Sequence, residues 1–80
     1  MDERRTTARQ RVFKAGTIEF NRVGAIGCTV RNISLGGACL EFDSILGVPG
    51  TFDLVIRADR TMRHCKVMWR NAKRVGVAFE

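Results

Sequence analysis

The strongest constraint on the fold of this chain is a two-residue alternation of apolar and other side chains, repeated along most of its 80 residues. Such alternation places one set of side chains on one face of a β-strand and the other set on the opposite face. It begins after Gly16, and no window of about ten residues has the spacing of an amphipathic helix. The sequence therefore predicts six short strands, at residues 17–20, 26–31, 38–43, 52–57, 65–70 and 75–79.

Residues that favour turns separate these strands, at 21–24, 34–37, 47–50, 58–61 and 71–73. Gly, Asn and Ser are frequent in these segments, and the single proline, Pro49, lies in the third of them. Six strands in so short a chain must protect their edges from pairing with other chains, and closure into a barrel does this. We therefore expect an all-β fold, a small six-stranded antiparallel β-barrel with little or no helix.

The same alternation predicts which side chains fill the barrel. Trp69 shares the phase of Cys65 and Val67, which favours a core or barrel-rim tryptophan, and at the rim it could stack on a planar aromatic ligand. His64 lies on the polar phase without a carboxylate or cysteine beside it in sequence, so we expect no ligand or catalytic role for it. The expected inward residues are Ile26, Cys28, Val30, Ala38, Leu40, Phe42, Phe52, Leu54, Ile56, Cys65, Val67, Trp69, Val75, Val77 and Phe79.

Charge divides the chain into two parts. Residues 1–14 are polar and basic and are expected to form a flexible N-terminal arm, whereas residues 15–80 form the barrel. The formal net charge is +6 and the isoelectric point is near 10.3. Such a balance suits an anionic partner, which could be a nucleic acid, a nucleotide or an acidic protein, although positive charge can also serve solubility alone.

Several classes of function are disfavoured. No signal peptide and no apolar run of about 20 residues is visible, so we expect a cytoplasmic protein without a membrane partner. The three cysteines, Cys28, Cys39 and Cys65, are widely spaced and accompanied by a single histidine, which favours reduced thiols over a zinc site. We find no nucleophile with a base and no phosphate-transfer loop, so neither an enzyme nor a resident cofactor is expected.

The first group of candidate binding residues lies in the basic arm. Arg5 and Arg9 are four residues apart, and Arg4 and Arg11 flank them. A guanidinium group is permanently charged, planar and forked, so it can bind phosphate oxygens or the O6 and N7 edge of guanine through two hydrogen bonds. The spacing alone is also compatible with a solvated basic tail.

The second group lies at a junction between two predicted strands. Asn32 and Ser34 have short polar side chains that can cap backbone groups or bind a ligand. Gly36 and Gly37 follow them, and the absence of a Cβ would let a ligand approach the main chain closely. By themselves these residues could also serve only a tight hairpin.

Taken together, the two groups resemble the motifs of the PilZ domain family. The residues that carry the resemblance are Arg5 and Arg9 in an R-x-x-x-R pattern, then Asn32, Ser34 and Gly37 in an N-x-S-x-x-G pattern. The segments 30–38 and 75–79 also look like this family, so the resemblance runs over essentially the whole chain. It implies a bacterial receptor for the second messenger cyclic di-GMP.

The resemblance also implies a role for each motif. Arg5 and Arg9 would contact guanine edges and phosphates, and Asn32, Ser34 and Gly37 would form the surface beneath the ligand, with Gly36 beside them. Arg4 suggests the family's binding of an intercalated pair of dinucleotides. Ligand binding would then be relayed to an unidentified downstream protein.

Two other functions remain open at this point. One is a PilZ-like barrel that has lost its ligand and acts as a protein-interaction module. The other is a basic nucleic-acid-binding barrel, which is less favoured because most of the aromatic residues share the apolar phase and the chain has no tyrosine.

Overall fold

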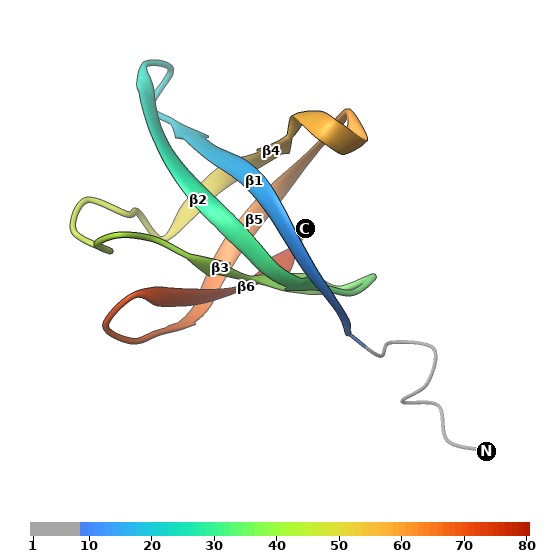
Figure 1. Ribbon diagram of the computed structural model, residues 1–80. Helices are drawn as coiled ribbons and strands as arrows, with labels where there is room; N and C mark the ends of the chain where they lie inside the picture. Colours follow the sequence, from blue (N-terminus) through green and yellow to red (C-terminus); the bar gives the residue numbers. More distant parts are fainter. Residues whose placement is uncertain (1–8) are drawn as a thin grey trace.

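Residues 9–80 are described in a computed structural model, and they form a closed barrel of six antiparallel strands (Figure 1). A single turn of 3₁₀ helix, η2, joins β4 to β5, and no α-helix is present in the described residues. The expected all-β barrel of six strands is therefore confirmed. Its elements are β1 (Gln10–Phe20), β2 (Gly24–Ile33), β3 (Gly37–Glu41), β4 (Thr51–Ile56), η2 (Arg57–Asp59), β5 (Thr61–Arg70) and β6 (Arg74–Phe79).

The strands are ordered β1-β2-β3-β6-β5-β4 around the barrel. β1 and β2 pair along almost their whole length and form a long hairpin that projects from the barrel (Figure 1). The barrel closes through a much shorter contact, in which only Thr17–Glu19 of β1 pair with Asp53–Val55 of β4. The N-terminal half of β1 therefore lies along β2 without a β4 partner. Within the described part of the chain, no helix is long and apolar enough to cross a bilayer.

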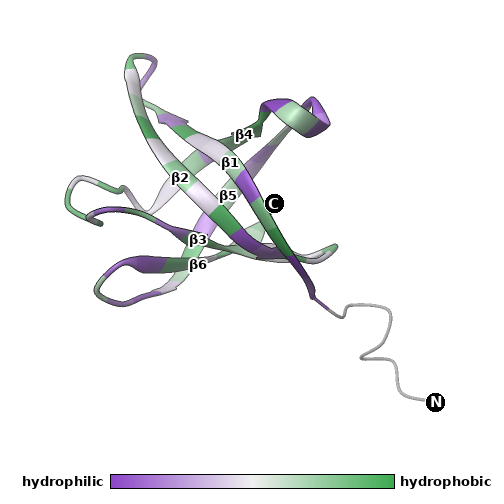
Figure 2. Cartoon of the chain, viewed as in Figure 1, coloured by the Kyte–Doolittle hydropathy of each residue, from purple (hydrophilic) through white to green (hydrophobic). Residues whose placement is uncertain are grey.

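Apolar and polar residues alternate along the strands (Figure 2), and the apolar set fills the barrel. Branched aliphatic side chains dominate this core, as expected for residues that pack well on a pleated surface. Most of the predicted inward residues are confirmed as members of the core or as packed against it. The buried cluster comprises Ile18, Val30, Ala38, Leu40, Phe42, Val48, Phe52, Leu54, Ile56, Cys65, Val75 and Val77.

The first strand begins earlier than the sequence pattern indicates. β1 starts at Gln10, whereas a strand was expected only from Thr17, so residues 10–14 of the predicted arm belong to the barrel. Gln10 pairs with Ile33, and the ladder shifts register between Arg11 and Lys14. Exposure still alternates across this β-bulge, but exposed Phe13 lies on the outward phase and half-buried Lys14 on the inward phase, so hydropathy does not mark the strand. The strand is held by its pairing with β2, which local sequence does not reveal.

The prediction that Trp69 follows the inward phase of Val67 is wrong. The β5–β6 ladder shifts register between Val67 and Trp69, and this bulge moves the indole to the outer face, where the residue is 44% exposed. Trp69 instead packs against Gly76, its partner on β6, because a Cβ added at Gly76 would overlap the indole ring.

Candidate functional site

The fold brings one residue of each sequence motif into direct contact. Arg9 is exposed and immediately precedes β1, and its Nη1 donates a hydrogen bond of 2.6 Å to Oδ1 of Asn32 near the end of β2. The contact follows from the β1–β2 register, in which Arg11 lies opposite Asn32. Arg4 and Arg5 of the first motif lie outside the described residues.

Ser34 and Gly37 shape the turn that joins β2 to β3. The Ser34 amide donates to the Gly37 carbonyl at 2.8 Å, and the Ser34 hydroxyl accepts from the Gly36 amide at 3.3 Å. Gly37 is packed so closely on β6 that a Cβ there would overlap the Val77 carbonyl oxygen, whereas a Cβ at Gly36 would meet nothing within 4 Å. The second motif therefore contains a turn-forming serine, a tightly packed glycine and an open glycine.

Small side chains cover the outer face between Asn32 and Trp69. Residues paired across neighbouring strands point to the same face of a sheet, and Asn32 pairs with Cys39, Cys39 with Gly76, and Gly76 with Trp69. The neighbouring row continues this surface with Gly37, Ala78 and Lys66. Three strand spacings of about 4.8 Å separate the Asn32 and Trp69 backbones by about 14 Å. The result is a smooth floor between the Arg9–Asn32 pair and an aromatic side chain.

Trp69 is the residue of this surface that the alternating pattern placed incorrectly. Gly76 offered a signal, because a glycine inside an apolar strand often marks the close approach of another group. Here the approaching group is the indole of Trp69 itself.

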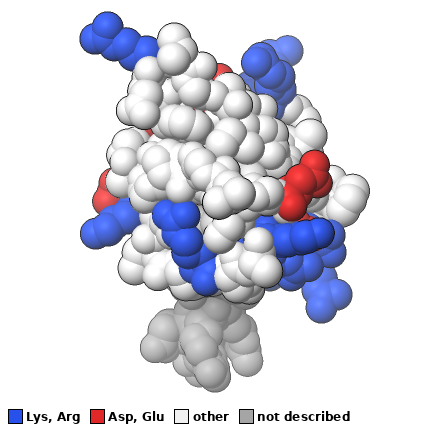
Figure 3. All heavy atoms as spheres, turned by 90° about the vertical axis from the view of Figure 1, so that its left-hand side faces the viewer, with Lys and Arg blue, Asp and Glu red and all other residues white. Residues whose placement is uncertain are grey.

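A network of charges borders the floor. The carboxylate of Glu41 on β3 forms ion pairs with Arg31 at 3.2 Å and with Arg74 at 3.6 Å, and the Arg31 guanidinium lies 5.4 Å from the centroid of the Phe13 ring. Arg9, by contrast, makes no ion pair with any described carboxylate. Away from the Arg9–Asn32 contact, on the left-hand side of Figure 1, Lys and Arg are again the more prominent charged side chains (Figure 3). Positive charge near the floor is thus only partly neutralised.

The other potentially reactive side chains are either buried or paired on the barrel surface. Burial raises the pKa of the Cys28 thiol to about 12 and that of Cys65 to about 11, so both remain protonated and poorly nucleophilic at neutral pH. His64 contacts Asp53 at 2.9 Å and Glu80 at 3.4 Å on the barrel surface, two partners that are distant in sequence. No group of three or more potential metal ligands lies within residues 9–80 in a suitable arrangement.

Comparison with known proteins assigns the chain to a family. A search of curated proteins found no significant match. The family model described as the PilZ domain matches residues 3–80, and PilZ domains are binding modules for cyclic di-GMP rather than enzymes. The match covers essentially the whole chain, so this protein belongs to the PilZ domain family.

Proposed function

We propose that this PilZ domain binds cyclic di-GMP on the outer face of β2, β3, β6 and β5, between Arg9 and Trp69. The observation that carries the proposal is the hydrogen bond between Arg9 and Asn32, which joins the two motifs at the edge of a smooth floor. A dinucleotide presents two phosphates and two guanines, and these are the groups that forked cations and flat apolar surfaces recognise.

Arg9 is suited to the charged contact. Its guanidinium carries five N–H donors, one of which is directed to Asn32, while the residue is exposed and its charge is not balanced by a described carboxylate. The remaining donors can form a bidentate pair with the O6 and N7 atoms of guanine or with a phosphate. The contact with Asn32 holds the arginine near the floor before ligand binds, which reduces the entropy lost on binding.

Trp69 is suited to a stacking contact. Its indole lies on the same face as Asn32 and covers Gly76, and Cys39 between them is only 5% exposed, so the indole itself is the surface on which a planar base can stack. Stacking of a base on an aromatic side chain contributes about 1–3 kcal/mol. We assign Trp69 as the aromatic partner of one guanine.

The remaining motif residues complete the proposed site. Arg5 would supply a second guanidinium, and Arg4 a third that suits an intercalated pair of dinucleotides. Ser34 and Gly37 would fix the β2–β3 turn under the ligand, and the open position at Gly36 leaves room for it. Binding at this face would then be relayed to a partner protein.

Calorimetric titration of cyclic di-GMP tests the proposal. Loss of a bidentate arginine–guanine pair costs about 1–3 kcal/mol, so Arg9→Ala should weaken binding by about 5- to 150-fold. Arg22→Ala is the matched control, because Arg22 is an exposed arginine at the tip of the β1–β2 hairpin. It should bind like the wild type. A flat wild-type trace, or equal losses in both variants, would refute the proposed site.

Salt dependence separates this function from nucleic-acid binding. A protein that contacts 6–10 phosphates of DNA loses roughly 10³- to 10⁵-fold in affinity between 50 and 200 mM salt, whereas two phosphates can release few counterions. We expect a shallow salt dependence for cyclic di-GMP and weaker binding of single-stranded DNA at 200 mM salt. Tighter binding of the DNA at that salt concentration would favour the nucleic-acid alternative.

A further inference from the structure

A second surface, outside the proposed nucleotide site, combines exposed apolar side chains with free positive charge. Thr17 on β1 pairs with Val55 on β4, and Val55 pairs with Met62 on β5, so the three side chains share one outer face. Two adjoining hollows of about 320 and 340 Å³ lie along it and share Val55 and Arg57 in their linings. We refer to these two adjoining hollows together as the depression; the first reaches Phe13 and the second reaches Met62.

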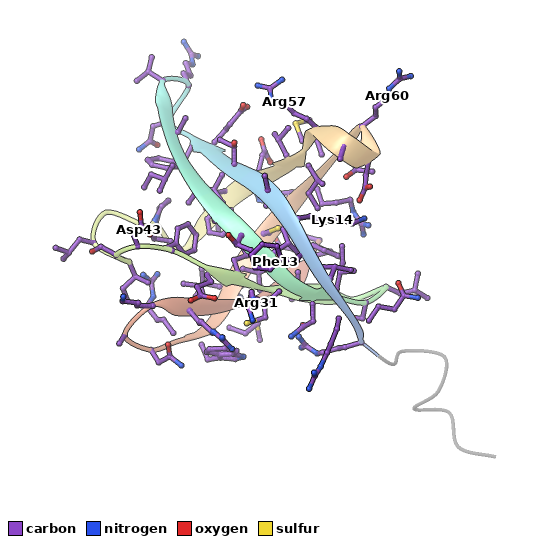
Figure 4. The ribbon with its side chains drawn as sticks, in the orientation of Figure 1. Phe13, Lys14, Arg31, Asp43, Arg57 and Arg60 are labelled. Atoms are coloured by element: carbon purple, nitrogen blue, oxygen red, sulfur yellow. The ribbon has the colours of Figure 1, made fainter. Side chains whose placement is uncertain are left out.

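Two large apolar side chains of this surface are exposed to solvent and take no part in the core. Phe13 is 77% exposed and Met62 is 64% exposed. The bulge between Arg11 and Lys14 interrupts the β1–β2 register beside Phe13, and the Arg31 guanidinium stacks on the ring from one side (Figure 4). Aromatic residues and methionine are enriched at protein–protein interfaces, where both supply contact area.

Two arginines supply the charge, Arg57 at the start of η2 and Arg60 directly after it. Lys14 is neutralised by Asp59 at 2.7 Å, but Arg57 and Arg60 make no ion pair with any residue of the described chain. Both side chains point away from the barrel (Figure 4). Arg60 has a φ of 56°, a left-handed conformation that favours glycine, so the backbone itself does not favour arginine there.

We propose that this surface of β1, β4 and η2 docks a protein segment in which an apolar side chain is flanked by carboxylates. The apolar side chain fills the depression beside Phe13 and Val55, and the carboxylates pair with Arg57 and Arg60. A polyanion fits less well, since much of the depression is apolar and, among residues 9–80, only two cations without an ion pair border it. The proposal is independent of nucleotide binding, because Arg9, Asn32 and Trp69 lie outside this surface.

A peptide array provides the probe. It presents peptides of about a dozen residues with one Leu or Phe between Asp or Glu residues, each beside a copy with Asn or Gln in place of the acids and a copy with Ser in place of the apolar residue. Fluorescently labelled wild-type protein should bind a subset of the acidic–apolar peptides with a Kd below about 1 mM and bind neither altered copy comparably. Absence of any such peptide, or equal binding of the uncharged copies, would overturn the proposal.

Two matched variants locate the site without risk to the fold. Arg60 and Arg22 both have positive φ, so Arg60→Gly and Arg22→Gly each remove one charge where glycine is favoured. Loss of one exposed ion pair should make Arg60→Gly bind the selected peptide up to about fivefold more weakly, and Arg57→Ala/Arg60→Gly should bind it up to about 25-fold more weakly. Phe13→Ser should cost about tenfold or more, as expected for a buried aromatic contact. Arg22→Gly should bind it like the wild type.

Nuclear magnetic resonance of ¹⁵N-labelled protein completes the test. Peptide should shift the amide resonances of Phe13, Val55, Arg57 and Met62, while shifts confined to another face would overturn the proposal. Binding of single-stranded DNA or of anionic phospholipid vesicles through these residues, more tightly than any peptide, would also overturn it. Arg60→Gly should retain cyclic di-GMP binding, so that failure here is distinguishable from failure of the nucleotide site.

Discussion

Substitution of Gly37 by alanine is expected to destabilise the barrel severely, although the change adds only one methyl group. A Cβ at this position would overlap the Val77 carbonyl oxygen of β6, and a backbone atom in a paired strand cannot rotate away as a side chain can. β3 and β6 must therefore separate locally by on the order of 1 Å to restore an ordinary contact. Gly36 is the natural control, since a Cβ there meets nothing within 4 Å and its φ is not positive.

The magnitude follows from what this separation disturbs. Overpacking of this kind costs about 1–3 kcal/mol. The turn also holds two hydrogen bonds of 2.8 Å, from Ser34 N to Gly37 O and from Phe79 N to Gly36 O, each worth about 0.5–1.5 kcal/mol. Alanine has less conformational freedom than glycine in the unfolded chain, and this stabilises the folded state by about 0.4–1 kcal/mol. Central values give a net loss of about 3 kcal/mol, within a range of about 1–6 kcal/mol, out of the roughly 4–12 kcal/mol that a chain of this length possesses.

Urea denaturation followed by Trp69 fluorescence and circular dichroism measures this loss. With an m-value of about 1 kcal/mol/M, the midpoint should fall by about 3 M in Gly37→Ala and by less than about 0.5 M in Gly36→Ala. Equal midpoints for the two variants would refute the argument that Gly37 is required by strand packing. Any loss of nucleotide binding in Gly37→Ala would then need a direct contact with ligand to explain it.

Three further outcomes follow from the packing and the thiols. Gly76→Val should displace the Trp69 indole, shift its emission to longer wavelength and weaken cyclic di-GMP binding; unchanged emission would contradict the packing. Leu54 is 1% exposed, so Leu54→Ala should lower the free energy of unfolding, measured by urea denaturation, by about 2–5 kcal/mol. A loss below about 1 kcal/mol would show that neighbouring side chains move in to fill the cavity. Because burial raises the pKa of Cys28 from 9.0 to about 12 and that of Cys65 to about 11, the unfolded chain loses its thiol protons first. Stability should be unaffected by these thiols below pH 9 and should fall as pH rises above 9, by at most about 1.4 kcal/mol per pH unit per thiol; Cys28→Ala should flatten this fall, and an identical slope in that variant would contradict it.

The alternating pattern was sufficient to predict the strands, the barrel and most of its core, because each strand has one face buried and one exposed. The contact between the motifs was also accessible to sequence reasoning. Arg9 precedes the first strand and Asn32 ends the second, and an antiparallel hairpin brings those two ends together. The strands and this contact both depend on local periodicity and chain order, which the sequence displays directly.

The start of β1, the position of Trp69 and the partners of His64 could not be predicted in the same way. A β-bulge arises from competition between the packing of two strands, so its site depends on residues far apart in sequence. The contact of His64 with Asp53 depends on the β4–β5 register, and that with Glu80 on a backbone hydrogen bond of 2.9 Å between Glu80 N and His64 O. Register and closure are properties of the assembled barrel.

The bulge in β5 also explains why Trp69 lies on the outer face. In a strictly alternating barrel an aromatic side chain on the inward phase is buried, so its exposure requires a break in the alternation. For Trp69 this break is the register shift between Val67 and Trp69, whereas Phe13 needs none, because it shares the outward phase of Ala15 and Thr17. Arg31 lies between the two proposed binding surfaces: its neighbour Asn32 accepts the hydrogen bond of Arg9, while its own guanidinium stacks on Phe13. A ligand that moves Arg9 away from Asn32 therefore acts one residue from the Arg31–Phe13 contact, which borders the docking surface. If nucleotide binding changes the affinity for the docked peptide by some factor, the peptide must change the affinity for the nucleotide by the same factor.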